Sequence, residues 1–130
     1  MIAFMFMALV ASQSTEAVSA SIEVPEVIIP AAEPYVDCLS QTQLALSQHA
    51  GPVHWQKVQE IVEQTRHHCA SVRVGAREKA LRLIERDGSV PVAQRAARVD
   101  QAFADIDRSD DQFVAEVRRI DENQQAQKPQ

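Results

Sequence analysis

The sequence predicts an all-α protein: a three-helix antiparallel bundle with long second and third helices, preceded by a signal peptide and an extended arm. Only three of the 130 residues are Gly, and the chain after residue 20 is rich in the helix formers Ala, Gln, Glu and Arg. Apolar residues recur there at steps of three and four, the spacing of one helix face. Residues 51–52 (Gly-Pro) and 87–89 (Asp-Gly-Ser) divide this pattern as turns do. The length suits a single domain.

The first segment has the features of an export signal. Residues 1–11 are continuously apolar, which matches the hydrophobic region of a signal peptide and is too short to span a bilayer. Small residues at 18–20 (Val-Ser-Ala) predict cleavage after Ala20, with residues 9–11 as a second option. No Lys or Arg precedes the apolar run, so a start upstream of Met1 stays open, as does a buried N-terminal segment in a cytosolic protein. We expect residues 1–20 to be a signal peptide and the mature protein to be periplasmic or secreted, without membrane attachment after cleavage.

Residues 21–33 are predicted to form an extended arm, because Pro25 and Pro30 disfavour a helix. Residues 27–29 (Val-Ile-Ile) are too apolar to face solvent together, so part of the arm is expected to lie over a helix groove. The helical domain then spans residues 34–123, and the polar residues 124–130 are expected to be a disordered tail.

The first helix is predicted at residues 34–49. Pro34 suits the first helical position, and Glu33 and Asp37 place negative charge near the positive end of the helix dipole. Its core-facing residues are Tyr35, Cys38, Leu39, Thr42 and Leu46. Gly51 then ends this helix, and Pro52 opens the next.

The second helix is predicted at residues 53–87, with Gly88 as its C-terminal cap. Its apolar series is Val58, Ile61, Val62, Thr65, Cys69, Val72, Ala76, Ala80 and Ile84. Gly75 interrupts the interior of this helix, at a cost of about 1 kcal/mol relative to Ala.

The third helix is predicted at residues 90–123, with Ser89 as its N-cap. Its core series is Val92, Ala96, Val99, Phe103, Ile106, Asp110, Phe113, Val117 and Ile120. These steps alternate between four and three, the period of coiled-coil packing. Only Asp110 is polar, so a break at residues 109–111, with Ser109 capping a separate last helix, stays open as an alternative.

The second and third helices should pack antiparallel across their tight turn, so that residues at one level have numbers summing to about 177 (87 plus 90). Residues 66–98 hold eight Lys or Arg and three acids, whereas residues 100–122 hold three Arg and eight acids. The expected pairs are Arg77 with Asp100, Arg73 with Asp105, and Arg66 with Asp111.

A partner-binding surface has two candidates. The first is a basic patch for an acidic partner, made by Arg73, Arg77, Lys79, Arg82 and Arg86, with Arg73, Arg77 and Arg82 as the binding candidates. The alternative, and the more usual arrangement, is that these are charges on the helix flank paired with acids of the third helix. The second candidate is Trp55, which could anchor a partner. The alternative, and the more frequent role of a lone Trp near a loop, is to cover the end of the core.

The two cysteines, Cys38 and Cys69, suit one disulfide in an exported chain. Across the first turn Cys38 lies opposite about residue 65, which leaves Cys69 one helical turn further, about 6 Å along the axis. The bond therefore requires the loop to shift or the helices to cross. Free buried thiols and a redox role are the alternatives.

A metal-binding or metal-sensing protein using His49, His54, His67 and His68 is the rival class of function. Adjacent helical residues point about 100° apart, so His67 and His68 cannot chelate one ion from one helix face. No catalytic or cofactor motif occurs, and we expect neither enzymatic activity nor a cofactor. The net charge of -5 argues against a nucleic-acid partner.

Residues 34–39 (PYVDCL), behind a Pro- and Ala-rich junction and ahead of the second cysteine, resemble small uncharacterised exported helical proteins of alphaproteobacteria. The resemblance covers the leader and roughly the first half of the mature chain. It implies a periplasmic location and a Cys38–Cys69 link, and it implies no activity. We therefore expect a small periplasmic helical protein that acts through a protein partner, still unknown, or through self-association.

Overall fold

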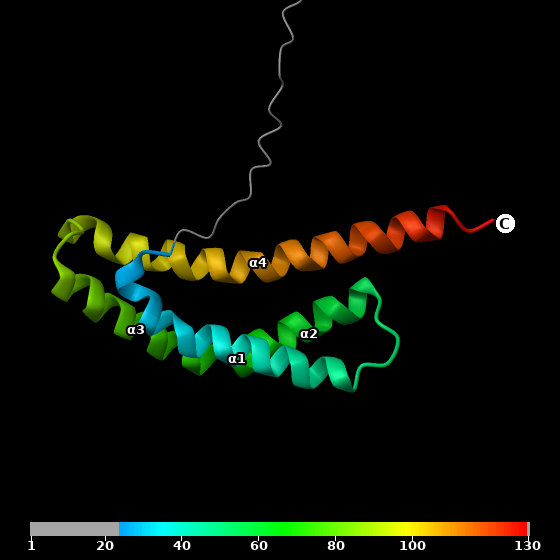
Figure 1. Cartoon of the computed structure of the whole chain (residues 1–130), viewed down its shortest axis with the longest axis horizontal. Helices are drawn as coiled ribbons and strands as arrows, with labels where there is room; N and C mark the ends of the chain where they lie inside the picture. The colour runs from blue at the N-terminus through cyan, green and yellow to red at the C-terminus, as the bar shows by residue number, and fades with distance from the viewer. Residues whose placement is uncertain (1–23, 130) are drawn as a thin grey trace, which may run out of the picture.

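The computed structural model describes residues 24–129 and shows an all-helical chain. The predicted signal peptide, residues 1–20, lies outside this range. A short 3-10 helix, η1 (Glu26–Ile28), leads into α1 (Ile29–Gln48), and the chain continues through α2 (Trp55–His68), α3 (Ala70–Asp87) and α4 (Val92–Ala126) (Figure 1). Within this range no helix is both long and apolar enough to cross a membrane.

The helices form three rods. α1 runs in one direction, α2 and α3 return one after the other, and α4 runs back along both of them (Figure 1). α1 packs on α2 and α3, and α4 packs on the same two helices. The α2–α3 rod is therefore the centre of the molecule, and α1 and α4 lie on it as neighbours that run in parallel.

The prediction of three helices is wrong in number, because the second helix is divided at Cys69. The backbone there (φ -91°, ψ 5°) leaves the α-helical range, and α2 and α3 meet at an angle (Figure 1). The Cys69 N–H still donates to Thr65 O, and the Arg73 N–H to Cys69 O, both at 2.9 Å. These helical hydrogen bonds continue across the bend. The predicted apolar series is therefore buried in both α2 and α3, with Val72 only partly buried.

The predicted extended arm is also wrong over residues 26–33, which form η1 and the first turns of α1. Pro30 lies in the first turn, where its missing N–H removes no helical hydrogen bond. Pro34 lies inside α1 and leaves one carbonyl without its usual donor, but Pro30 and Pro34 are both exposed, so water can bind there. Ile28 and Ala31 are fully buried, and this burial extends the helix beyond the predicted start. As expected, the segment covers a helix, since η1 packs on α3.

α4 is continuous through Asp110, which settles the alternative that the sequence left open. The Ser109 hydroxyl donates to Ile106 O (2.8 Å) and caps no new helix. The helix begins at Val92, with Pro91 rather than Ser89 at the N-cap, because the Ser89 N–H and hydroxyl bind the Asp87 carboxylate. It ends at Ala126, so the expected tail is helical over its first residues.

The core is built mainly from small and medium aliphatic residues around two aromatic rings. Tyr35 and Phe103 are its largest fully buried side chains, and their ring centroids lie 6.0 Å apart. The next largest fully buried side chains are Ile28, Ile84, Val99, Thr65 and Cys69. These residues come from η1 and from all four α-helices, so no α-helix is peripheral to the core.

Two glycines provide a matched test of the backbone. Gly88 ends α3 in the left-handed region (φ 72°), as predicted, whereas Gly75 lies inside α3, and no atom lies within 4 Å of an added Cβ at either position. We expect Gly88→Ala to lower the free energy of unfolding by about 1 to 2 kcal/mol, because only the backbone conformation opposes it. Gly75→Ala should raise it by up to about 1 kcal/mol. Urea denaturation of both variants checks this, and equal effects of one sign would contradict it.

Candidate functional site

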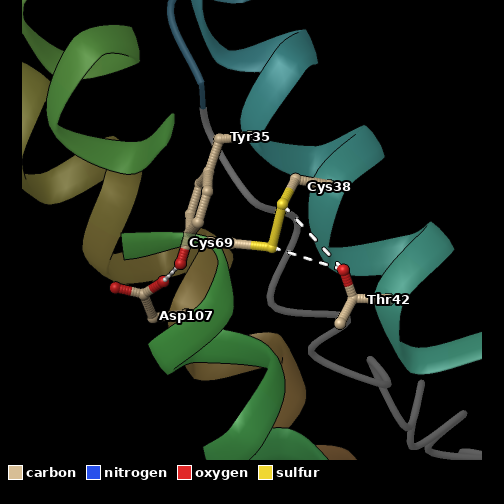
Figure 2. Close-up of a disulfide and its surroundings, with 5 residues drawn as sticks. All are labelled: Tyr35, Cys38, Thr42, Cys69 and Asp107. Atoms are coloured by element: carbon tan, nitrogen blue, oxygen red, sulfur yellow. Dashed lines mark hydrogen bonds between the residues drawn. A yellow bond between two sulfur atoms is a disulfide. The ribbon is translucent and has the colours of Figure 1, made fainter. Parts of the chain in front are cut away.

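A disulfide between Cys38 and Cys69 joins α1 to the bend between α2 and α3 (Figure 2). The two Cα atoms lie 6.0 Å apart, so the pairing predicted from the sequence is confirmed. The sequence predicted that Cys69 lies one helical turn beyond the position opposite Cys38. The bend at Cys69, between α2 and α3, removes this offset. The Thr42 hydroxyl lies 3.6 Å from Cys69 Sγ and 4.0 Å from Cys38 Sγ. The link fixes the position of α1 on the central rod.

A polar layer lies beside the disulfide and connects all three rods. The Tyr35 hydroxyl donates to Asp107 Oδ1 (2.6 Å), and Figure 2 shows the ring reaching from α1 toward α4. The Arg73 guanidinium donates from Nε (3.1 Å) and Nη2 (2.8 Å) to Asp107 Oδ2. It also lies 5.8 Å from the Tyr35 ring and 5.6 Å from the Phe103 ring, close enough for cation–π attraction. Asp107 is therefore the acceptor that holds α1 and α3 against α4.

Electrostatics keep the Tyr35 hydroxyl and the Arg73 guanidinium protonated. Burial raises the pKa of the Tyr35 hydroxyl far above its usual value, and the hydrogen bond and charge of Asp107 raise it further. Burial opposes the charge on Arg73, but the hydrogen bond and charge of Asp107 outweigh that effect and raise its pKa. The pKa of each residue moves away from neutrality, so neither suits proton transfer near pH 7.

Further polar contacts continue this layer along α4. Gln43 donates to Asp110 Oδ1 (3.1 Å), which explains how the predicted core series tolerates a carboxylate. Arg66 pairs with Asp111 (2.9 Å) and also donates to the Asp107 backbone carbonyl. Among residues 24–129, three buried atoms of the layer have no hydrogen-bond partner: Thr65 Oγ1, Arg66 Nε and Asp110 Oδ2. Ordered water is the usual partner of such atoms.

The antiparallel register, in which paired residue numbers sum to about 177, correctly predicted two of the three expected ion pairs. Arg77 pairs with Asp100 (2.6 Å), and Arg66 pairs with Asp111, as expected. The third expectation is wrong, because Arg73 reaches Asp107 (2.8 Å) and not Asp105. Asp105 instead accepts from Arg108 on its own helix (2.8 Å).

The predicted basic patch is divided by these pairs. The polar layer holds Arg73, and Asp100 holds Arg77 in a two-bond contact that raises the pKa of the guanidinium and lowers that of the carboxyl. Arg82 is exposed on α3, and the described residues include no ion-pair partner for it. Of the three arginines, only Arg82 therefore has a guanidinium that is not committed to α4.

Trp55 is partly buried and is held from two sides. Its backbone N–H donates to Asp121 Oδ2 (2.7 Å), and the Arg118 guanidinium lies 4.7 Å from its ring centroid. Both partners belong to α4, so Trp55 fastens the start of α2 to the distal half of that helix. Asp121 supplies the N-terminal acceptor that α2 lacks in its own sequence.

The four histidines lie at three separate places. His49 follows the end of α1, and His54 precedes the start of α2. His67 and His68 are exposed in the last turn of α2, beside a surface hollow that Thr42, Leu46, Glu63 and Gln64 also line. Within residues 24–129, no three His, Cys, Asp or Glu side chains come together in a group that could hold a metal ion.

α4 carries an apolar stripe over its distal half, which we define as Phe113, Val117 and Ile120; Phe113 and Ile120 are exposed, and Val117 is partly buried. Phe113 is 59% exposed and Ile120 42%, so their prediction as core residues is wrong; Val92, 76% exposed, and the exposed Ala96 are two more such cases. Beyond Asp107 the partly buried residues of α4 are Asp110, Val114, Val117 and Asp121. Their wider spacing moves the buried line round the helix, away from the heptad positions. The heptad pattern is real in the sequence, but α2, which packs on the distal half of α4, leaves Phe113 and Ile120 exposed.

Two surface grooves lie between α1 and α4. The Phe113 groove, about 140 Å³, is lined by Gln43, Ser47, Val53, Val58, Ile61, Val62 and Phe113. The α1/α4 groove, about 370 Å³, is lined by Val24, Ile29, Ala32, Glu33, Val36, Asp37 and Ile106. Both are walled mainly by apolar side chains. They exist because α1 and α4 are each packed on the central rod and only lightly on each other.

Sequence reasoning missed Asp107 and both grooves. Asp107 is one of many acids along α4, and no spacing distinguishes it before Tyr35 and Arg73 are placed beside it. The exposure of Phe113 depends on how α4 rotates against α2, which the periodicity of one helix does not determine.

Comparison with known proteins found no matching family model, no matching curated protein and no matching solved structure.

Proposed function

We propose that this chain is a small exported helical protein that acts by binding a helix of another protein along the distal half of α4. The observation that carries the proposal is the exposed stripe, in which Phe113 is 59% and Ile120 42% exposed. Both residues continue the heptad series whose middle members, Val99, Phe103 and Ile106, are buried in the fold. Heptad positions are apolar where a second helix packs on them, and within the described part of the chain only these three middle positions of the series are buried.

The Phe113 groove supports a protein partner over a small ligand. About 140 Å³ is below the 300 to 1,000 Å³ typical of small-molecule sites, but it suits one or two side chains projecting from a partner helix. The floor is apolar, through Val58, Ile61 and Val62, and the α1 rim is neutral, through Gln43 and Ser47. A partner helix is therefore expected to place apolar side chains in the groove.

Export is proposed on the apolar residues 1–11 and the small residues 18–20. The Cys38–Cys69 pair supports it, because disulfides persist in the periplasm and outside the cell but are rare in the cytosol. A binding role rather than catalysis is supported by the polar layer, whose Tyr35, Arg73 and Asp107 are engaged with one another.

Site-specific photo-crosslinking in an exporting bacterium tests the proposal. A photoreactive phenylalanine analogue replaces Phe113, and in a control it replaces the exposed Ala115, about 200° away round the helix at 100° per residue. We expect the chain in the periplasm with Ser21 as its first residue and a discrete cross-linked product from position 113 alone. Adding Ile120→Ser should abolish that product while leaving the circular dichroism spectrum unchanged.

Two results would count against this reading. Identical products from positions 113 and 115, or none from position 113, would show that the stripe is not a binding face. A product with twice the mass of the chain would identify self-association, which would replace the partner protein by a second copy.

A further inference from the structure

The α1/α4 groove is separate from the α4 stripe and differs from the Phe113 groove in its charge. Ala32 and Ile106 form a buried floor, and Ile29 and Val36 form walls that are 42% and 41% exposed. Its volume of about 370 Å³ is roughly ten times the share of one water molecule, about 30 Å³, so it has room for several aliphatic side chains.

The rim of this groove is acidic. Glu33 and Asp37, four residues apart on α1, are the only charged residues among the described ones that line it, and both are exposed. Neither has an ion-pair partner within the described part of the chain. From Val24 to Val53 the chain carries three acids, Glu26 included, and no Lys or Arg.

Two arginines on the helices packed against α1 are paired elsewhere. Arg73 of α3, whose guanidinium lies 5.8 Å from the ring of Tyr35, is held by Asp107, and Arg66 of α2 is held by Asp111. The carboxylates of Glu33 and Asp37 are therefore available to a cation from outside the chain. Opposite charge at an interface rim contributes mainly to association rate and specificity, while the apolar floor provides buried area.

From these features we infer that the α1/α4 groove binds a basic amphipathic helix of a partner protein. Ile29, Glu33 and Val36 follow one another at i, i+4 and i+7, so the groove runs along α1 for about two turns, or about 10 Å. A partner helix laid in it presents apolar residues at the same spacing to Ile29, Val36 and Ile106. Lys or Arg beside those residues then meets Glu33 and Asp37. The inference is independent of the α4 stripe and of its proposed partner.

The test uses two synthetic peptides with the full mature chain. Both are about 14 residues long, four helical turns, with Leu on one face; one has Lys on the other face and its matched control has Glu. Fluorescence anisotropy of the labelled Lys peptide should show saturable binding that weakens as salt rises. The Glu peptide should bind at least about tenfold more weakly, as expected for like charge at the rim.

Charge-matched variants distinguish the groove from general acidity. Glu33→Gln with Asp37→Asn should weaken binding of the Lys peptide about five- to tenfold, the scale expected for two exposed opposite charges. Glu78→Gln with Glu85→Gln removes two exposed carboxylates from α3 and should leave binding unchanged. Val36→Ser, which removes an apolar side chain from the groove wall, should also weaken binding of the Lys peptide. Equal losses from the two charge variants, or no loss from the first, would overturn the inference.

Two other occupants give distinct results. If the chain's own residues before Val24 fill the groove, a form that begins at Val24 will bind the Lys peptide at least about tenfold more tightly than the mature chain. If a second copy fills it, sedimentation will show a dimer that Val36→Ser dissociates. Either result would overturn a partner helix as the occupant.

Discussion

Removing the disulfide is expected to lower the free energy of unfolding by about 3 to 4 kcal/mol. The two cysteines are 31 residues apart, and the chain-entropy model gives that range for a loop of this length. A chain of this size buries a modest core, so such a loss is a large fraction of the 5 to 15 kcal/mol typical of small proteins. Guanidinium denaturation of Cys38→Ala with Cys69→Ala, compared with the unchanged chain, measures it.

Chemical reduction distinguishes the contribution of the covalent link to stability from that of the cysteine side chains. The unchanged chain with excess dithiothreitol should lose nearly the same free energy as the double variant, and dithiothreitol should not affect the double variant further. If reduction has no effect while the double variant is destabilised, the loss comes from the buried volume of Cys69 and not from the covalent link.

The disulfide also shows which structural features could be predicted from the sequence and which could not. Two cysteines in a chain predicted to be exported led to the prediction of the bond, and the antiparallel register of the first two predicted helices gave its offset of one turn. The bend at Cys69 that absorbs the offset has no signal in the sequence, because the apolar series crosses it without interruption. Helix faces depend on local spacing, whereas a bend of this kind depends on which helices must be joined.

The same distinction between local sequence pattern and tertiary packing applies to the helix ends and to the protein surface. Gly88 ends α3 as predicted, because only the left-handed conformation of that one residue is needed. Prolines misled the prediction at the start of α1, where the burial of Ile28, Ala31 and Tyr35 outweighs the local preference against a helix. The exposed stripe at Phe113 and the acidic groove at Glu33 depend on how α1 and α4 lie across the central rod, a property of tertiary packing that periodicity does not carry.

The second large effect is expected at Asp107. Asp107→Ala should lower the free energy of unfolding by about 2 to 4 kcal/mol. The Tyr35 hydroxyl, on a side chain that is only 1% exposed, would lose its acceptor at a cost of about 1 to 3 kcal/mol. Arg73 would lose its paired carboxylate, but its side chain is 33% exposed, so solvent screening limits that part to about 1 kcal/mol.

A double-mutant cycle with Tyr35→Phe isolates the hydrogen bond. Tyr35→Phe alone should cost about 1 kcal/mol, whereas in the Asp107→Ala background it should cost nothing, because the unpaired hydroxyl is then removed. Asp100→Ala is the matched control: it removes a carboxylate from the same helix that also makes two bonds to an arginine, but its side chain is 54% exposed. A loss at Asp100 as large as that at Asp107 would mean that the ion pairs alone stabilise the bundle. A loss confined to Asp107 and coupled to Tyr35 would show that the buried hydroxyl fixes how α1 lies against α4, and with it the shape of both grooves.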